Sequence, residues 1–310
     1  MVKNPFIWAE GQRVILTNNQ ARDIKKFYSK IAKEMDSTVE KMKNRDTPYA
    51  IEKRIYLTNV SNELKQKIND VDKKTEKTIN TNVETMVGKV LQNNEVYLKG
   101  IGFKDFIQNP QLKVDMATRV VSGQLYQNKW SLSSAIWGDN QKKMNEINMI
   151  ISRGILKNKT TYQIAKELQR YVNPAAKKVV DWNSQYGVRR QIDYNAQRLA
   201  RTMVSHAYQE AFVAATINNP FIEAYKWVTS GLHNVCALCI EREEDDAWGL
   251  GPGIFPKEAL PLDHPNGMCT FEVVTSYDEN TVADAINDWY FDEGDMELNN
   301  KIDKFINSLQ

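Results

Sequence analysis

The most regular pattern in the chain is a narrow apolar stripe between residues 57 and 90. Apolar side chains recur there mostly at three- and four-residue steps, Lys and Glu fill many intervening positions, and no proline occurs in residues 49–109. This spacing predicts an amphipathic helix of roughly 40 residues or more. A stripe this narrow resembles a coiled-coil seam, so it needs a partner helix from the same chain or from another copy. The stripe comprises Leu57, Val60, Leu64, Ile68, Val71, Thr75, Ile79, Val83, Met86 and Val90.

The helical period also marks several shorter segments. Residues 12–45 form a mixed-charge helical stretch that ends before Pro48, because proline disfavours helix in the preceding residue. Thr160 and Gln163 have the spacing of a capping box, which predicts a helix that continues to Tyr171. Further helices are expected after Asn109-Pro110, near residues 131–155, over residues 189–218 and in an acidic tail at 282–309.

The pattern changes at Phe221. Residues 224–229 alternate with aromatic and β-branched side chains, as a strand does, and residues 271–275 form a second short strand. We therefore expect a mostly α protein built from long amphipathic helices, α+β overall, with a small β-hairpin, zinc-knuckle-like subdomain near the C-terminus. The expected regions are a long-helix N-terminal region (1–110), a helical core (111–220), a β/Cys-His knuckle (221–275) and an acidic helical tail (276–310).

Charge is distributed unevenly along the chain. Of 310 residues, 26% are charged and the net charge is only +2. Residues 1–200 hold 35 Lys and Arg against 20 Asp and Glu, whereas residues 201–310 hold 6 against 19. This asymmetry predicts a nucleic acid, DNA or RNA, or another polyanion as a partner of the basic part, bound through phosphates without sequence preference. It also permits head-to-tail contact between copies, or simply solvated lysine-rich faces. The candidate phosphate contacts are Lys65, Lys67, Lys73, Lys74, Lys77, Lys142 and Lys143.

Membrane association is not expected. No window approaches the roughly 18 uninterrupted apolar residues of a membrane span. The first residues lack a basic segment followed by an apolar one, so no secretory signal is expected. These features favour the cytoplasm of the cell that makes the chain.

The clearest chemical signal is a cluster of cysteines. All three cysteines of the chain lie between Cys236 and Cys269. Cys236 and Cys239 form a CxxC pair, which lets two thiolates reach one ion from a tight turn. His264 and Cys269 complete a Cys₃His set that suits tetrahedral Zn²⁺. The loop at 241–262 has few apolar side chains, so a structural zinc ion would help to order it.

Other interpretations of this cluster stay open. The cysteines can be reduced thiols that pack as small apolar residues, or Cys236 and Cys239 can form a disulfide. His233 is a spare candidate ligand.

A catalytic interpretation of the cluster centres on His264. Asp263-His264 is similar to the Asp-His pair of HNH nucleases, with Asn280 and Asn287 as the remaining candidates for the further His or Asn that such a site needs. A metal-dependent nuclease is therefore an alternative. His206 lies in an alanine-rich helical stretch, where a packing role is favoured over that of a base.

The order of features between residues 125 and 275 resembles the head-morphogenesis proteins of tailed phages, the minor head proteins related to the F protein of phage Mu. Two positions depart from that pattern: Met203 stands where an acidic residue is common, and Gly267-Met268 stands where Cys-Arg is common. The resemblance rests on Ser131-Leu132-Ser133, Ile136-Trp137, Gly154-Ile155, Thr160-Thr161-Tyr162-Gln163-Ile164-Ala165, Arg198-Leu199-Ala200-Arg201-Thr202, Trp227, Cys236-x-x-Cys239 and His264-Pro265.

This resemblance implies a structural component of the virion with no catalytic residues. Such proteins are minor capsid proteins that associate with the portal and act in head assembly and in DNA packaging or ejection. We therefore expect the portal protein or the major capsid protein as partner, together with double-stranded DNA bound without sequence preference. The apolar stripe of the long helix, taken by itself, also allows pairing with other copies of the chain. The expected location is the capsid interior or the portal vertex, with the host cytoplasm during assembly. A second alternative is a zinc-stabilised DNA-binding protein without a virion role.

Overall fold

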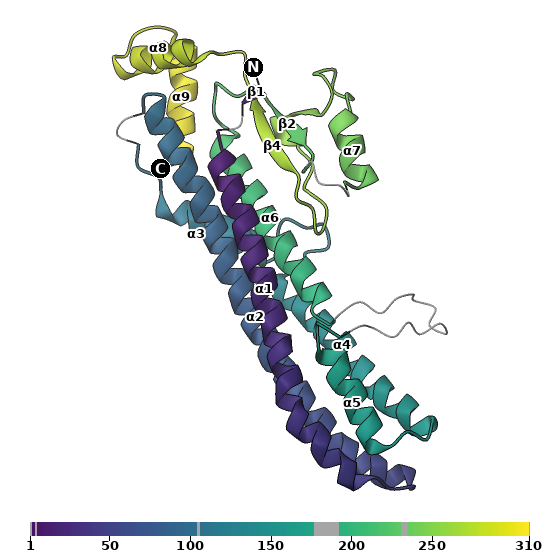
Figure 1. Ribbon diagram of the computed structural model, residues 1–310. Coiled ribbons are helices and arrows are strands. Elements are labelled where there is room, and N and C mark those ends of the chain that lie inside the picture. The colour runs from purple at the N-terminus through teal and green to yellow at the C-terminus, as the bar shows by residue number, and fades with distance from the viewer. Residues whose placement is uncertain (1, 4, 104–105, 177–191, 231–234, 310) are drawn as a thin grey trace. The chain divides into compact units, whose positions relative to one another are not determined.

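A computed structural model describes residues 2–3, 5–103, 106–176, 192–230 and 235–309. Figure 1 shows the helices and strands of the chain. The chain divides into two compact units. Unit 1 contains residues 1–17, 80–129 and 201–310, and unit 2 contains residues 18–79 and 130–200. This division differs from the four consecutive regions expected from the sequence, because three long helices each contribute to both units.

The fold is mostly helical with one small sheet, so the predicted α+β class is confirmed. Helix α1 begins at Ile7, ahead of the expected residue 12, and α2 covers the whole predicted stripe. The helices are α1 (Ile7–Lys41), α2 (Ala50–Gly100), α3 (Pro110–Val121), α4 (Leu132–Leu156), α5 (Thr161–Val172), α6 (Tyr194–Thr216), α7 (Ala237–Glu244), α8 (Glu279–Tyr290) and α9 (Met296–Leu309). The strands are β1 (Val2–Lys3), β2 (Ala224–Val228), β3 (Ile254–Pro256) and β4 (Thr270–Val274), and short 3₁₀ turns cover Met42–Arg45 and Lys257–Ala259.

In unit 2, the apolar stripe of α2 is buried within the chain. Leu57, Leu64 and Ile68 are each at most 1% exposed. Helix α1 buries Ile24 and Tyr28 completely. The chain therefore covers this part of the stripe itself, and no second copy is needed to bury it.

The centre of unit 2 contains a buried ionic network. Lys143 of α4 is 4% exposed. Its Nζ lies 2.8 Å from Asp72 Oδ1 and 2.8 Å from Asp139 Oδ2, and donates to the Tyr28 hydroxyl at 2.7 Å. Tyr28 in turn donates to Asp72 at 3.1 Å, and burial raises the pKa of this phenol well above its usual value. The network joins α1, α2 and α4 and leaves the ammonium with three oxygen partners.

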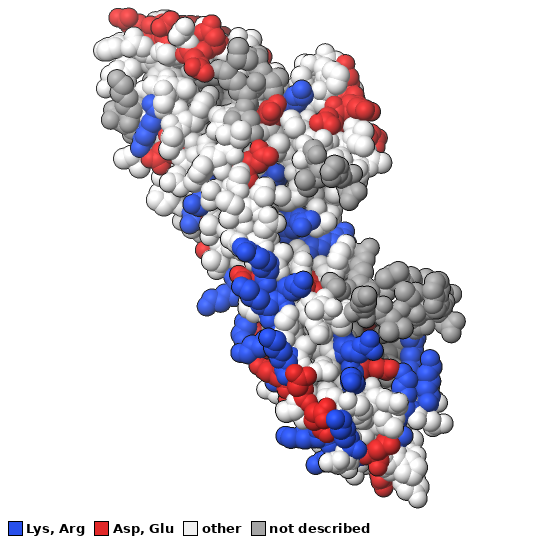
Figure 2. Space-filling view, in the orientation of Figure 1, with Lys and Arg blue, Asp and Glu red and all other residues white. Residues whose placement is uncertain are grey.

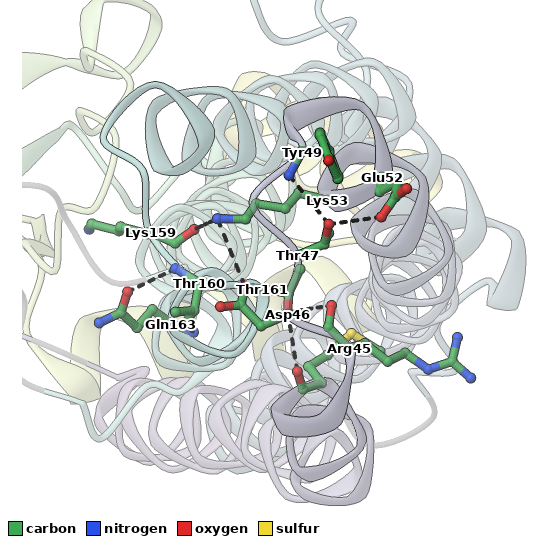
Figure 3. Close-up of polar contacts among 11 residues, drawn as sticks. Arg45, Asp46, Thr47, Tyr49, Glu52, Lys53, Lys159, Thr160, Thr161 and Gln163 are labelled. Carbon is green, nitrogen blue, oxygen red and sulfur yellow. Dashed lines mark hydrogen bonds and ion pairs between the residues drawn. The ribbon is translucent and has the colours of Figure 1, made fainter.

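The end of unit 2 is fixed by polar contacts between two chain turns (Figure 3). At the start of α5, the Thr161 amide donates to Asp46 Oδ1 at 3.1 Å and the Thr161 hydroxyl donates to the Arg45 carbonyl at 3.0 Å. Lys53 Nζ donates to the Lys159 carbonyl at 3.0 Å. The predicted capping box is present, with Thr160 and Gln163 each accepting from the other's backbone amide. The connection between α1 and α2 therefore docks on the start of α5.

In unit 1, an antiparallel sheet in the order β1-β4-β2-β3 packs with α6. Trp227 of β2 is fully buried and meets Phe271 of β4 at 5.3 Å between ring centroids. Tyr208 and Phe212 of α6 pack against the same Phe271 ring. The sheet thus rests on a core of aromatic side chains.

The acidic tail is helical as predicted, and it belongs to unit 1. Its apolar side chains pack with the end of α2 and the following turn. The cluster comprises Leu98, Phe103, Phe106, Phe221, Val282, Ile286, Ile302, Phe305, Ile306 and Leu309. Among the described residues, no helix combines the length and apolar character needed to span a membrane.

Candidate metal centre

The four predicted metal ligands come from three segments of unit 1. Cys236 is the N-cap residue of α7, and Cys239 lies in the first turn of that helix. Cys269 immediately precedes β4, and His264 lies in the loop before it. Cys239 and Cys269 are each 3% exposed, whereas Cys236 is at the surface.

The structure brings these side chains together. Cys236 Sγ and Cys239 Sγ lie 3.5 Å apart, so no disulfide joins them. His264 Nε2 lies 3.2 Å from the first sulfur and 3.1 Å from the second. Cys269 Sγ is 3.2 Å from Cys239 Sγ. Cys239 is thus the donor that contacts all three other predicted ligands.

The orientation of His264 suits metal binding. Its Nδ1 lies 3.0 Å from the Pro265 carbonyl oxygen, which can only accept a hydrogen bond. Nδ1 therefore carries the proton, and the lone pair of Nε2 faces the two sulfurs. A metal-binding histidine commonly has its second ring nitrogen bonded to a backbone carbonyl in this way.

One face of α6 holds the loop that carries His264. Ser205 donates to the Gly267 carbonyl at 3.0 Å, and Thr202 accepts from the Asn266 amide at 2.8 Å. Gln209 donates to the Pro261 carbonyl at 2.8 Å and accepts from the Asp263 amide at 2.9 Å. These contacts fix the loop from both sides of the candidate ligand.

His206 belongs to the same face and has the packing role expected from the sequence. Its Nε2 lies 2.9 Å from the Asp263 carbonyl, and its Nδ1 lies 2.8 Å from the Tyr126 hydroxyl. Burial lowers the pKa of His206 to about 4, so the ring is neutral at pH 7. The neutral ring donates through Nε2 and accepts from Tyr126 through Nδ1.

Arg13 supports the centre from α1. It is 1% exposed, and its two terminal nitrogens donate to the carbonyl oxygens of Cys269 at 2.7 Å and Met268 at 3.1 Å. The guanidinium lies over the Tyr208 ring, 4.7 Å from its centroid. Arg13 therefore fixes the backbone of one candidate ligand.

A further acidic side chain lies beside the sulfurs. Asp263 is 4% exposed, and its Oδ1 accepts from the His264 amide at 2.8 Å. A carboxylate oxygen of Asp263 and the sulfurs of Cys239 and Cys269 lie within 4.8 Å of one another, as do the donor atoms of Cys236, Cys239 and His264. Two trios of possible metal donors therefore overlap at Cys239.

Electrostatics at the centre favour protonated ligands in the absence of a cation. Burial raises the pKa of Cys239 above its usual value, and the neighbouring thiols raise it further. Burial likewise raises the pKa values of Cys269 and Asp263. A dication would reverse this preference by stabilising the thiolate and carboxylate forms. Three sulfurs and one imidazole are a ligand set that Zn²⁺ prefers in closed structural sites.

The lysines predicted to contact phosphate differ in how far their side chains are exposed to solvent. Lys73, Lys74 and Lys77 on α2 and Lys142 on α4 are exposed. Lys65 and Lys67 are half-buried; Lys65 donates to Asn148 at 2.7 Å, and Lys67 pairs with Glu34 at 2.6 Å. Lys143 is the exception, because its ammonium is buried between Asp72 and Asp139 and cannot reach a phosphate. The prediction that Lys143 contacts DNA is wrong.

Figure 2 shows how charge is spread over one face of the molecule. Acidic side chains gather over α7 and α8, where the surface carries few basic ones. Over α1 and α2, lysines and arginines predominate and alternate with some acidic residues. Surface charge therefore follows the asymmetry seen along the sequence, although the basic area is not free of acids.

Several residues that carry the family resemblance have clear structural roles. Ser131 caps α4 by accepting from the Ser134 amide, and Thr160 caps α5. Gly154 lets α4 approach α5, because a Cβ there would lie 2.5 Å from Ile164 Cγ1. In these roles the three residues position helices α4 and α5.

Comparison of this chain with protein-family models, with curated proteins and with solved structures found no match.

The spare ligand candidate His233 lies outside the described residues.

Sequence reasoning missed the residues that surround the ligands. Helix α7 was not predicted, and neither were β1 and β3. Arg13 is 256 positions from its bonding partner Cys269, so nothing local indicates the contact. A polar stripe on the alanine-rich α6, formed by Thr202, Ser205 and Gln209, was a signal that could have been found.

Proposed function

We propose that this chain is a structural minor head protein of a tailed phage, without enzymatic activity. In this proposal it associates with the portal or the major capsid protein and with packaged double-stranded DNA, and acts in head assembly and in DNA packaging or ejection. It resides in the capsid interior or at the portal vertex of the virion. The proposal unites the resemblance over residues 125–275 with the chemistry of the metal centre.

The observation that best supports a structural and not a catalytic role for the metal centre is the arrangement of His264. Its Nε2 lone pair faces the sulfurs of Cys236 and Cys239, while the Pro265 carbonyl holds its other nitrogen. Cys269, which contacts Cys239 at 3.2 Å, is proposed as a further ligand, so that protein donors would fill the coordination positions of zinc and leave none for a water nucleophile. A closed site of this kind stabilises a fold, whereas a nuclease would need His264 free to act on water or phosphate.

DNA contact is proposed for the exposed lysines of unit 2. Lys73, Lys74 and Lys77 lie within two turns of α2, and Lys142 lies on α4. Such contacts bind phosphate without reading sequence and weaken as salt rises. The acidic surface over α7 and α8 suits a protein partner with basic groups.

A titration of linear double-stranded DNA tests this proposal. The protein is added at low and high salt in the presence of Mg²⁺ or Mn²⁺, and shift and cleavage are measured on gels. We expect a salt-sensitive shift with intact DNA. Replacing Lys73, Lys74 and Lys77 with Gln should lower the slope of log affinity against log salt by roughly 0.9 for each phosphate that is no longer neutralised. The matched control replaces Lys99, Lys301 and Lys304 with Gln and should bind as the wild type does.

Two results would contradict the proposal. DNA cleavage that is abolished by His264→Ala would identify a metal-dependent nuclease. Mass spectrometry of particles purified from cells that produce the chain should detect it at low copy number. If DNA binding is confirmed but the chain is absent from particles, the protein is a zinc-stabilised DNA-binding protein outside the virion.

A further inference from the structure

The carboxylate of Asp263 is buried without its full set of partners. The side chain is 4% exposed, and Oδ1 accepts from the His264 amide at 2.8 Å. Oδ2 is buried and makes no hydrogen bond to any residue that the structure describes. A buried carboxylate oxygen without a partner is costly, since burial removes the water that would otherwise solvate it. The Arg13 guanidinium and the Cys269 amide lie near this carboxylate, but the terminal nitrogens of Arg13 bond to the carbonyl oxygens of Cys269 and Met268, so a bound cation is the partner that would satisfy Oδ2.

The position of this carboxylate indicates that a metal ion bound to the neighbouring sulfurs would be that partner of Oδ2. An oxygen of Asp263 and the sulfurs of Cys239 and Cys269 all lie within 4.8 Å of one another. An ion bound to Cys239 would lie about 2.3 Å from its sulfur, which places it within reach of a carboxylate at this separation. Asp263, Cys239 and Cys269 are all buried, so an ion held between them would be shielded from solvent on this side.

The backbone at residue 267 is shaped around the same carboxylate. A Cβ on Gly267 would lie 2.2 Å from both Oδ1 and Oδ2 of Asp263. The carboxylate thus occupies the space that a side chain at this position would take. Glycine at 267 is the residue that lets the Asp263 side chain turn toward the sulfurs.

We propose that Asp263 is a direct ligand of the metal ion at this centre, in addition to the cysteines and His264. This inference rests on the zinc site of the proposed function. It makes the centre a mixed site of thiolate, imidazole and carboxylate. Zn²⁺ takes carboxylate oxygens at about 2.0–2.2 Å and can expand from four donors to five, so the proposed centre would hold one donor more than an ordinary tetrahedral structural site.

The test compares Asp263→Asn with the wild type in zinc affinity, measured by competition with a chromophoric chelator. Asparagine keeps the Oδ1 acceptor for the His264 amide and nearly the same volume, so it removes mainly the charged donor. Loss of an outer-shell partner costs about 10–100-fold in metal affinity. For a direct ligand we expect a loss of more than about 100-fold. Glu244→Gln, an exposed change of equal charge on α7, is the control and should bind zinc as the wild type does.

Two further measurements keep the proposal testable if Asp263→Asn does not fold. X-ray absorption of the zinc-loaded wild type should give sulfur neighbours around zinc and, in addition, more oxygen or nitrogen neighbours than the single imidazole nitrogen of His264 would supply. The double variant Asp263→Gly with Gly267→Cys places a thiol where the carboxylate was and should recover most of the zinc affinity. Cobalt(II) spectra of that variant should show one more thiolate than the wild type.

The outcomes separate this inference from the zinc site itself. A wild type that binds no zinc or cobalt would overturn both. A wild type that binds zinc, with an absorption spectrum fitted by sulfur and a single imidazole, would overturn the role of Asp263 alone. An affinity of Asp263→Asn within about 100-fold of the wild type would do the same.

Discussion

Both units of this protein bury charged side chains, but they stabilise them differently. In unit 2, Lys143 is surrounded by the oxygens of Asp72, Asp139 and Tyr28, so the chain itself supplies the opposite charge. In unit 1, Asp263 keeps an unbonded oxygen beside Cys239 and Cys269. The ammonium of Lys143 in unit 2 is satisfied without a ligand, whereas the carboxylate of Asp263 in unit 1 is completed by a metal ion in our proposal. The stability of the two units should therefore respond to different changes.

Metal removal should produce the largest difference between the units. Chelation, or His264→Ala, should abolish the hydrogen-exchange protection of residues 235–274, because structural zinc contributes about 10–16 kcal/mol of binding free energy in small zinc domains. Residues 18–79 and 130–172 should keep their protection, since their core contains no metal ligand. Mass spectrometry of exchange with and without chelator measures both. Equal protection of residues 235–274 in the two samples would show that the knuckle does not depend on metal.

Disrupting the ionic network around Lys143 should give the next largest loss of stability. Lys143→Met should lower the free energy of unfolding by about 3–5 kcal/mol, because it leaves Asp72 and Asp139 buried without their cation. The neighbouring Lys142→Met is the control and should change stability by less than about 0.5 kcal/mol, since Lys142 is exposed. Chemical denaturation measures both variants. Equal effects at the two positions would mean that the network contributes no stability specific to burial.

Helix packing in unit 2 should respond to a single methyl group. Gly154→Ala places a Cβ 2.5 Å from Ile164 Cγ1, so α4 and α5 must separate at a cost of about 1–3 kcal/mol. Gly138→Ala in the same helix meets no atom within 4 Å and should stabilise by up to about 1 kcal/mol, since alanine favours helix. Thermal melts of the two variants should therefore shift in opposite directions. A stabilising Gly154→Ala would contradict the close approach of the two helices.

The smallest loss of stability is expected from removing the N-cap of α5. Thr160→Ala removes the side chain that accepts from the Gln163 amide, which should cost about 1 kcal/mol. Thr58→Ala, exposed in the interior of α2, should be neutral or slightly stabilising by comparison. The two denaturation midpoints give this difference directly. No loss on Thr160→Ala would mean that water replaces the cap at no cost.

Local patterns in the sequence were sufficient to predict most of the helices. The stripe from Leu57 to Val90 predicted α2 because helical periodicity depends only on residues a few positions apart. The capping box at Thr160 was predicted for the same reason. Cys236, Cys239, His264 and Cys269 could be grouped because they are chemically distinctive and lie within one short region of the chain.

Lysine charge alone was a poor guide to exposure. Lys142 and Lys143 are adjacent in the sequence and both looked available to phosphate, yet only Lys142 is exposed. The difference arises because successive residues of a helix point about 100° apart, and the core face of α4 includes Lys143. The acids that accept its charge come partly from another helix, so the sequence around Lys143 does not reveal them.

The sequence by itself determined the periodic helices, the charge asymmetry and the identity of the sulfur and imidazole donors. Only the tertiary structure decided that α2 finds its partners within the chain, that Arg13 holds the backbone of Cys269, and that Asp263 faces the sulfurs. The first two contacts join residues far apart in the chain, and the third depends on how the loop before β4 packs. Periodicity and spacing act over a few residues, whereas burial and hydrogen-bond satisfaction are properties of the assembled core.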